Sequence, residues 1–250
     1  MAKKPAKSDR QAVIEQMRKK QKGADRRRGF AIVGVCSVIA LTILALAIFP
    51  IVKRNLDLRE FNGLALEKIG APASACQDIT TKPADGNQDH VPVNTPVTYT
   101  DSPPTFGAHW NEANLAPAPM ERKFYTANDR PALEALMHNL EHGYTILWYD
   151  ETAAEDTAML NEIEGIASKF SGTSNFRYKF KAVPWTSADG EPFPADQHIA
   201  LTHWSAGGSG ETDTAKQIGV WQYCSEPSGE AVKDFMIEYP YTDSPEPDAM

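Results

Sequence analysis

The 250-residue sequence contains only one long apolar run and only three cysteines. No second run approaches the length needed to cross a bilayer, so a protein with several membrane spans is excluded. The cysteines form no C-x-x-C pair, which argues against a thioredoxin-type redox site. A G-x-S-x-G nucleophile elbow is missing, and the glycine-rich stretch 207–210 lacks the lysine of a phosphate-binding loop. The absence of a complete catalytic set favours a non-enzymatic protein over an enzyme.

Basic residues are scarce outside the N-terminal segment. Residues 1–29 hold eleven Lys and Arg against three Asp and Glu, a net charge of +8. The other residues hold 14 basic and 30 acidic side chains, a net charge of −16. Nucleic-acid phosphates repel such an acidic surface, so nucleic acid is excluded as a partner. The basic segment 1–29 is instead suited to anionic lipid.

The apolar run, residues 30–51, contains 22 residues and no charge. A helix of that length spans about 33 Å, which is enough for a hydrocarbon core of about 30 Å. The basic residues that precede it predict a cytoplasmic N-terminus and an extracytoplasmic C-terminal domain. We therefore expect a single-pass protein of the cell membrane, held in the lipid bilayer by residues 30–51. Cleavage after the small residues at 45–47 is the alternative, but the long basic segment and long apolar run favour an uncleaved anchor.

The cysteines agree with this topology. Cys36 falls in the predicted span, which leaves Cys76 and Cys224 for the outer domain. In an oxidising compartment these two can form a disulfide, and the large loop that it closes would stabilise the fold by up to about 5 kcal/mol. Two buried free thiols are the alternative.

The domain organisation follows from charge, hydropathy and proline content. We expect a basic cytoplasmic tail (1–29), a transmembrane helix (30–51), a helical stalk (52–69), an extracytoplasmic domain (70–240) and a loose acidic tail (241–250). Residues 70–130 are rich in proline and aromatic residues and show little periodicity. This composition predicts irregular segments that wrap a core.

The hydrophobic spacing predicts a mixed domain. A helix is expected after a cap at Asn128-Asp129 and should end at Gly143, a second lies near 152–170, and a third follows Ser228. Strands are predicted at 144–149, 198–204 and 219–223, together with a half-exposed alternating strand at 177–183. The fold class is therefore α+β, with a small, mostly antiparallel sheet and about three helices in the outer domain.

The sharpest local motif is His138-Asn139-Leu140-Glu141-His142. H-x-x-E-H on a helix can bind Zn²⁺ through two imidazoles while the glutamate acts as a base, but the strand predicted directly after Gly143 argues against a peptidase. Folding can still bring His109, His138, Glu141 and His142 together as a site for zinc or another transition metal. The alternative is a polar cluster that hydrogen-bonds to irregular backbone.

Two motifs carry a family resemblance. Tyr99–His109 reads YTDSPPTFGAH, and His138–Gly143 reads HNLEHG before a predicted strand. With Cys76 and Cys224 on either side, the sequence resembles the domain-of-unknown-function family 3105 of actinobacterial and related membrane-anchored proteins. The resemblance covers about residues 70–240.

The resemblance implies a role that the residues alone do not. Some anchored proteins of this type are similar to accessory subunits of the respiratory cytochrome bcc–aa3 supercomplex. It therefore implies a membrane-anchored accessory subunit whose partner is an integral membrane protein complex. A metal-binding domain or metalloenzyme that uses His138, Glu141 and His142 is the alternative, and a cell-envelope binding module is not separated from the accessory role by sequence.

Overall fold

The computed structural model describes residues 7–250, which divide into two compact units with a boundary after Asp57. The first unit consists of one helix, α1 (Lys7–Asp57). The second unit, from Leu58 to Met250, contains all the strands of the described chain. Residues 1–6 of the predicted basic tail lie outside the described residues.

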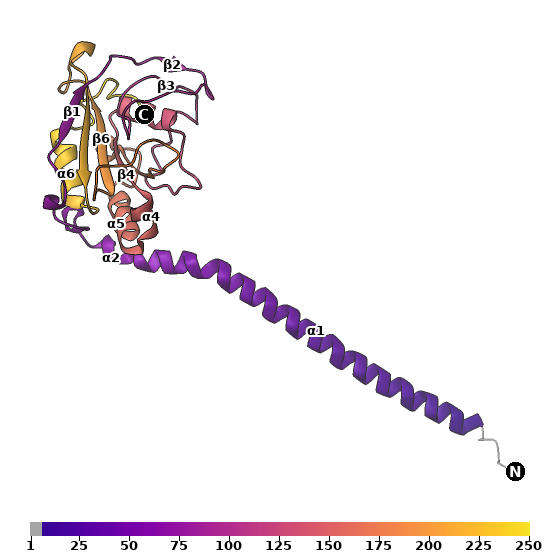
Figure 1. Cartoon of the computed structure of the whole chain (residues 1–250). Helices are drawn as coiled ribbons and strands as arrows, with labels where there is room; N and C mark the ends of the chain where they lie inside the picture. The colour runs from indigo at the N-terminus through magenta and orange to yellow at the C-terminus, as the bar shows by residue number, and fades with distance from the viewer. Residues whose placement is uncertain (1–6) are drawn as a thin grey trace. The chain divides into compact units, whose positions relative to one another are not determined.

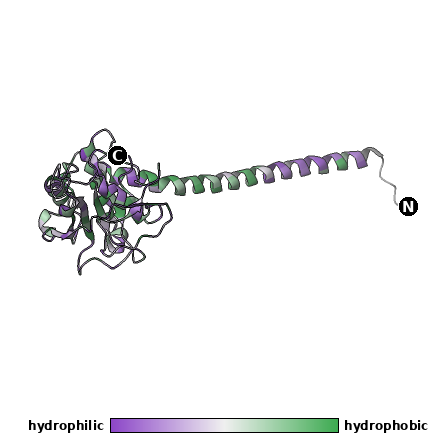
Figure 2. Cartoon of the chain, turned by 90° about the horizontal axis from the view of Figure 1, so that it is seen from above, coloured by the Kyte–Doolittle hydropathy of each residue, from purple (hydrophilic) through white to green (hydrophobic). Residues whose placement is uncertain are grey.

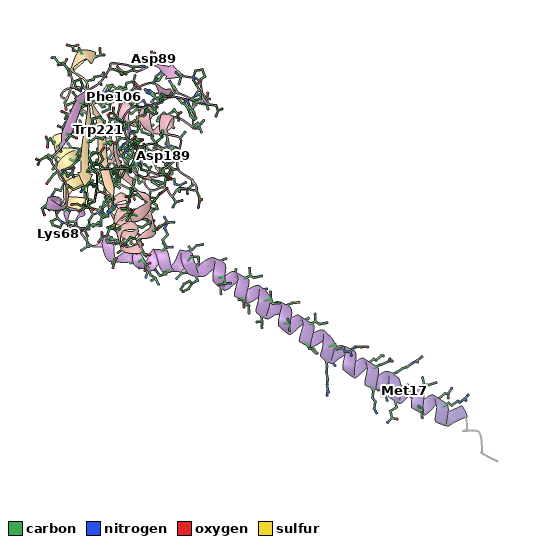
Figure 3. All side chains as sticks on the ribbon, viewed as in Figure 1. Met17, Lys68, Asp89, Phe106, Asp189 and Trp221 are labelled. Atoms are coloured by element: carbon green, nitrogen blue, oxygen red, sulfur yellow. A yellow bond between two sulfur atoms is a disulfide. The ribbon has the colours of Figure 1, made fainter. Side chains whose placement is uncertain are left out.

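Helix α1 includes the whole predicted span. Figure 2 shows a hydrophilic N-terminal part and a hydrophobic later part, and Figure 3 shows the side chains, Met17 among them, projecting from the helix. The large apolar residues of 30–51 are exposed within the chain. By length and composition, this is the one helix of the described residues that can cross a membrane.

The predicted stalk is only partly correct. Helix α1 continues to Asp57, but residues 58–69 form a short helix, α2 (Arg59–Asn62), and a 3-10 turn, η1 (Leu66–Lys68). Phe61 and Ile69 are buried in the core of the second unit. The apolar residues of this segment therefore pack on the domain, which a free stalk would leave exposed.

A five-stranded sheet organises the second unit (Figure 1). Its order is β1-β7-β6-β4-β5, and only β4 and β5 run parallel, so the expected mostly antiparallel α+β sheet is confirmed. The strands are β1 (Thr80–Pro83), β4 (Thr145–Tyr149), β5 (Phe180–Pro184), β6 (Ile199–Ser205) and β7 (Ile218–Cys224). Further 3-10 turns are η2 (Ala73–Ala75), η3 (Phe176–Tyr178) and η4 (Thr214–Lys216).

Both faces of the sheet are covered. Helices α5 (Thr157–Ser168) and α6 (Gly229–Glu238) pack with Leu147 and Tyr149 on one face. Helix α3 (Leu133–Glu141) packs with Ile146 and Trp148 on the other. Because successive side chains of a strand point to opposite faces, β4 is buried along its whole length.

Local capping explains two differences from the predicted helices. Helix α3 begins at Leu133, because the Asp129 carboxylate accepts a hydrogen bond from the backbone of Thr126 and forms a turn. The predicted second helix is divided into α4 (Glu151–Glu155) and α5, since Asp156 leaves the helical conformation and caps α5. Ser228 caps α6 as predicted.

The half-exposed strand predicted at 177–183 is wrong, because β5 is buried on both faces. The side chain of Lys181 donates to the carbonyl oxygens of Pro119 (2.6 Å) and Arg122 (3.2 Å). The polar side chains of the alternating pattern thus face irregular backbone. Carbonyl oxygens there have no partner in a helix or sheet and need hydrogen-bond donors from side chains. Alternation of polar and apolar residues shows that the two faces of a strand contact different surroundings. It does not show that the polar face is exposed to water.

The prediction of a loose tail at 241–250 is also wrong. Asp243 is buried and accepts hydrogen bonds from the backbone of Ala206 and Gly208. Lys179 donates to the carbonyls of Pro247 (2.8 Å) and Ala249 (2.7 Å). Hydrogen bonds to buried groups hold this segment in place, and apolar side chains do not. Its composition therefore did not predict that it is ordered.

Cys76 and Cys224 form the predicted disulfide, with 148 residues of sequence separation. It joins the segment after η2 to the last residue of β7.

Replacement of both Cys76 and Cys224 by alanine should lower the free energy of unfolding by up to about 5 kcal/mol, because the unfolded chain regains the entropy of a long loop. Denaturant unfolding measures this change. Cys36→Ala, at an exposed free thiol, is the control and should leave stability unchanged. Equal stability of the double variant and the parent would contradict the prediction.

Buried lysines should make the fold more stable as pH rises from 7 to 9. Burial, reinforced by the charge of Lys123, lowers the pKa of Lys181 to about 7. Between this value and the ordinary lysine pKa near 10.5, unfolding takes up a proton, so the free energy of unfolding increases with pH. Urea unfolding at pH 7, 8 and 9 should show the increase, and Lys181→Met should reduce it. Lys233→Met, on the surface of α6, is the control that should keep it; a flat profile in the parent protein would exclude this effect.

Candidate metal centre

A short two-stranded ladder brings two histidines side by side. Strands β2 (His90–Val91) and β3 (His109–Trp110) are parallel, and His90 is the register partner of His109. Partners in adjacent strands lie on the same face, and the two ring centroids are 4.9 Å apart. His109 is fully buried, whereas the side chain of His90 is 38% exposed.

Helix α3 supplies the other side of the cluster through its last turn. Positions i, i+3 and i+4 place His138, Glu141 and His142 on one face of the helix. All three side chains are buried. Nδ1 of His138 donates to the carbonyl oxygen of Trp110 at 2.7 Å, which joins α3 to β3.

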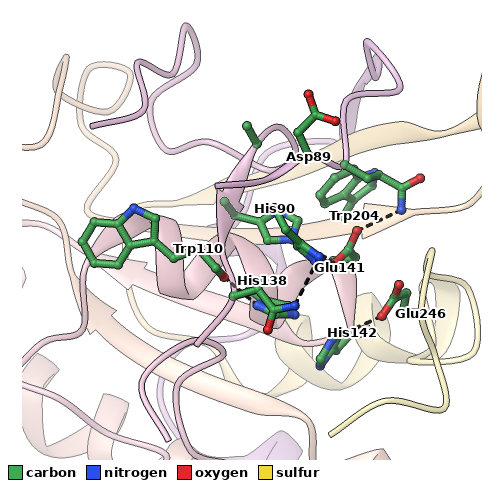
Figure 4. A network of polar contacts seen from close by, with 12 residues as sticks. Asp89, His90, Trp110, His138, Glu141, His142, Trp204 and Glu246 are labelled. Carbon is green, nitrogen blue, oxygen red and sulfur yellow. Dashed lines mark hydrogen bonds and ion pairs between the residues drawn. The ribbon is translucent and has the colours of Figure 1, made fainter. Parts of the chain in front are cut away.

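These elements converge on the Glu141 carboxylate (Figure 4). Its Oε2 lies 2.9 Å from Nε2 of His109 and 3.4 Å from Nε2 of His90. Its Oε1 accepts a hydrogen bond from Gln88 at 2.9 Å. One ligand atom from each of His90, His109, His138 and Glu141 lies within 4.8 Å of every other.

Backbone carbonyls fix the orientation of the buried rings. Nδ1 of His109 donates to the Gly107 carbonyl at 2.9 Å, just as His138 donates to Trp110. A neutral imidazole carries a single N–H, so Nε2 of each ring has a free lone pair when the ring is neutral; a second proton on Nε2 of His109 would instead donate to Glu141. Gly107 has φ of +126°, a conformation that side chains oppose, and this turn aims its carbonyl back at His109.

Burial and neighbouring groups set the charges of Glu141 and His138. Burial alone would raise the pKa of Glu141, but the hydrogen bond and charge of His109, together with Gln88, lower it to about 2. Burial, with His142 and His109 nearby, lowers the pKa of His138 to about 4. At neutral pH the carboxylate is therefore ionised and the His138 imidazole is neutral.

A second group lies on the other side of Glu141. His142, Glu246 and Glu141 each place a ligand atom within 4.8 Å of the other two. Nδ1 of His142 donates to the Met250 carbonyl at 2.9 Å, and its Nε2 lies 3.5 Å from the Glu246 carboxylate. Burial lowers the pKa of His142 to about 4, even though the Met250 carbonyl opposes this change.

A glycine at the end of α3 lets the C-terminal segment, residues 240–250, pack closely against the helix. Gly143 has φ of +85°, and a Cβ there would lie 2.3 Å from the Tyr241 carbonyl oxygen. The glycine of the HNLEHG motif thus ends the helix and admits the backbone of residues 240–250. The Glu246 N–H then donates to the Glu141 carbonyl at 2.9 Å.

The structure brings together most of the residues that the sequence singled out. His109, His138 and Glu141 share one cluster, and His142 lies beside it in the second group. The sequence prediction missed His90, Gln88 and Glu246, which belong to no motif. His198, which contacts Asp150, and His203, which contacts Asp243, belong to neither group.

Comparison with known proteins finds one family whose model matches most of the second unit. The family described as "Protein of unknown function (DUF3105)" matches residues 90–250. The chain belongs to this family. The matched region includes His90, both motifs and Glu246, and so covers both groups. No curated protein and no solved structure matches the chain.

Proposed function

We propose that this DUF3105 chain is a membrane-anchored extracytoplasmic protein whose outer domain binds a transition metal ion through His90, His109, His138 and Glu141. The main support comes from two buried imidazoles, those of His109 and His138. The Nδ1 atom of each donates to a backbone carbonyl, and the Glu141 carboxylate lies on the Nε2 side of His109. Metal-ligating histidines characteristically donate their second nitrogen to such a carbonyl, which orients the ring.

The contact between His109 and Glu141 needs a positive charge. With its N–H committed to Gly107, a neutral His109 would direct a lone pair at a carboxylate oxygen only 2.9 Å away. Either a second proton on the ring or a metal ion between the two atoms relieves this repulsion. Because ligand atoms of His90 and His138 lie around the same point, a metal ion satisfies more of the cluster than one proton does.

The donor set favours zinc among the common ions. Three imidazoles and one carboxylate suit borderline metals such as Zn²⁺, which binds them at about 2.0–2.1 Å in tetrahedral geometry. Ligand atoms around such an ion lie about 3.3 Å apart. The contacts of 2.9 and 3.4 Å at Oε2 of Glu141 are close to this spacing.

His90 is the adaptable ligand at the exposed side. Its Nδ1 lies 3.2 Å from the side-chain nitrogen of Asn111, and a half-turn of that amide would present the oxygen as an acceptor. Nε2 of His90 would then be free to bind the ion.

Zn²⁺ should bind the metal-stripped full-length protein tightly, and His109→Ala or His138→Ala should weaken this binding by about 100-fold or more. The expectation rests on the loss of a direct ligand, since even second-shell losses cost 10–100-fold. Equilibrium dialysis with elemental analysis measures the change in protein purified in detergent through an N-terminal tag without histidine.

His198→Ala is the matched control, because His198 pairs with Asp150 away from both groups. This variant should bind Zn²⁺ like the parent protein. Absence of tight binding in the parent would leave the cluster as an imidazolium–carboxylate pair and refute the proposal.

A second candidate function is that of an accessory subunit of a membrane protein complex, with the cytochrome bcc–aa3 respiratory supercomplex as the specific expectation from the resemblance. The observation that favours it is the exposed apolar surface of α1 over residues 30–51, which lipid or the helices of a partner can cover. Metal binding and an accessory role are compatible.

The test is co-migration with a large complex on native gels after solubilisation in mild detergent. Replacement of residues 30–51 by a leucine-rich span of equal length should keep the chain in the membrane but abolish co-migration, because helix packing depends on side-chain shape. A parent protein that migrates only as a free chain, under conditions that preserve respiratory complexes, would rule out this role.

A further inference from the structure

We infer that the outer domain holds two metal ions, bridged by the Glu141 carboxylate, and that the C-terminal segment 240–250 builds the second position. This inference rests on the proposed metal-binding function and extends it. The second position consists of Glu141, His142 and Glu246.

Glu141 is suited to bridge two ions. A carboxylate has two oxygens and about four lone-pair sites. Oε2 faces His109 and His90, whereas Oε1 accepts only the Gln88 hydrogen bond among the contacts of the described residues. Glu141 is also the one residue that both ligand groups share.

His142 faces the second position for the same reason that His109 faces the first. Its Nδ1 donates to the Met250 carbonyl, so Nε2 directs its lone pair towards Glu246, whose carboxylate lies 3.5 Å away. A proton on Nε2 or a cation between the two atoms relieves the repulsion of this contact. Because a carboxylate oxygen of Glu141 lies within 4.8 Å of both ligand atoms, a metal ion satisfies three groups where a proton satisfies two.

The C-terminal segment is held where the second position requires it. Lys179 donates to the carbonyls of His142 (2.7 Å), Pro247 (2.8 Å) and Ala249 (2.7 Å). The backbone of Glu246 donates to Glu141. These bonds fix the backbone on both sides of Glu246 against the end of α3, so its side chain starts from a fixed place beside His142.

The two positions differ in chemistry. The first has three imidazoles and is mostly buried, whereas the second has one imidazole and two carboxylates. The Glu246 side chain is 47% exposed, which leaves space for water ligands. The second position should therefore take a divalent metal such as Zn²⁺, Co²⁺ or Mn²⁺ more weakly than the first. An ion with open coordination sites beside a second ion is the arrangement that activates bound water.

Zn²⁺ stoichiometry on the metal-stripped full-length protein tests this inference. We expect two equivalents per chain in the parent protein and one in Glu246→Gln and His142→Ala. Asp248→Asn is the matched control, because it removes the same charge from the same segment without touching either group, and should keep two equivalents.

The outcomes separate the two proposals. One equivalent in the parent and in Glu246→Gln would overturn the second position while the proposed metal-binding function stands. No tight binding in the parent would overturn both.

A Co²⁺ titration followed by electron paramagnetic resonance tests the bridge. Two ions bridged by a carboxylate couple magnetically, so the second equivalent should add much less signal than the first. A signal that doubles would show two independent ions and overturn the bridge.

Discussion

The carboxylate of Glu141 is a buried negative charge, and the surrounding structure has to compensate it. An ionised carboxylate removed from water is costly unless hydrogen bonds and positive charge replace its hydration. Here the compensation comes from two segments that pack against α3: residues 88–90, through Gln88 and His90, and the strand β3, through His109. The irregular N-terminal half of the domain is therefore organised around one side chain of a helix, and a metal ion in this position would complete the compensation.

The same requirement extends to the backbone. Segments 84–130 and 240–250 contain little regular structure, so their carbonyl oxygens have few ladder partners. Buried donors satisfy many of them: Lys179 and Lys181 reach four, and His109, His138 and His142 reach three more. The lysines next to and within β5 thus act as internal donors. Their lowered pKa values follow from burial and give the fold its expected pH dependence.

Periodic features of the sequence predicted the fold well, and non-periodic ones did not. The apolar span, the strand at 144–149 and the Ser228 cap follow from local spacing, and each is present. The i, i+3, i+4 spacing of HNLEHG placed three candidate ligands on one helix face. His90 escaped prediction because its proximity to His109 arises from a two-residue ladder between distant irregular segments, for which no local pattern exists. Glu246 escaped it because Lys179, far away in sequence, holds the tail.

The pairing of β1 with β7 has a consequence for synthesis. β1 is the first strand of the sheet to be made and β7 the last, and the Cys76–Cys224 bond joins the same regions. Until β7 emerges, β1 has no neighbour, and the edge of β6 stays open. Folding that awaits such distant partners is slow and exposes apolar strands to aggregation. The sheet of this protein therefore cannot be completed until residue 224 has been made.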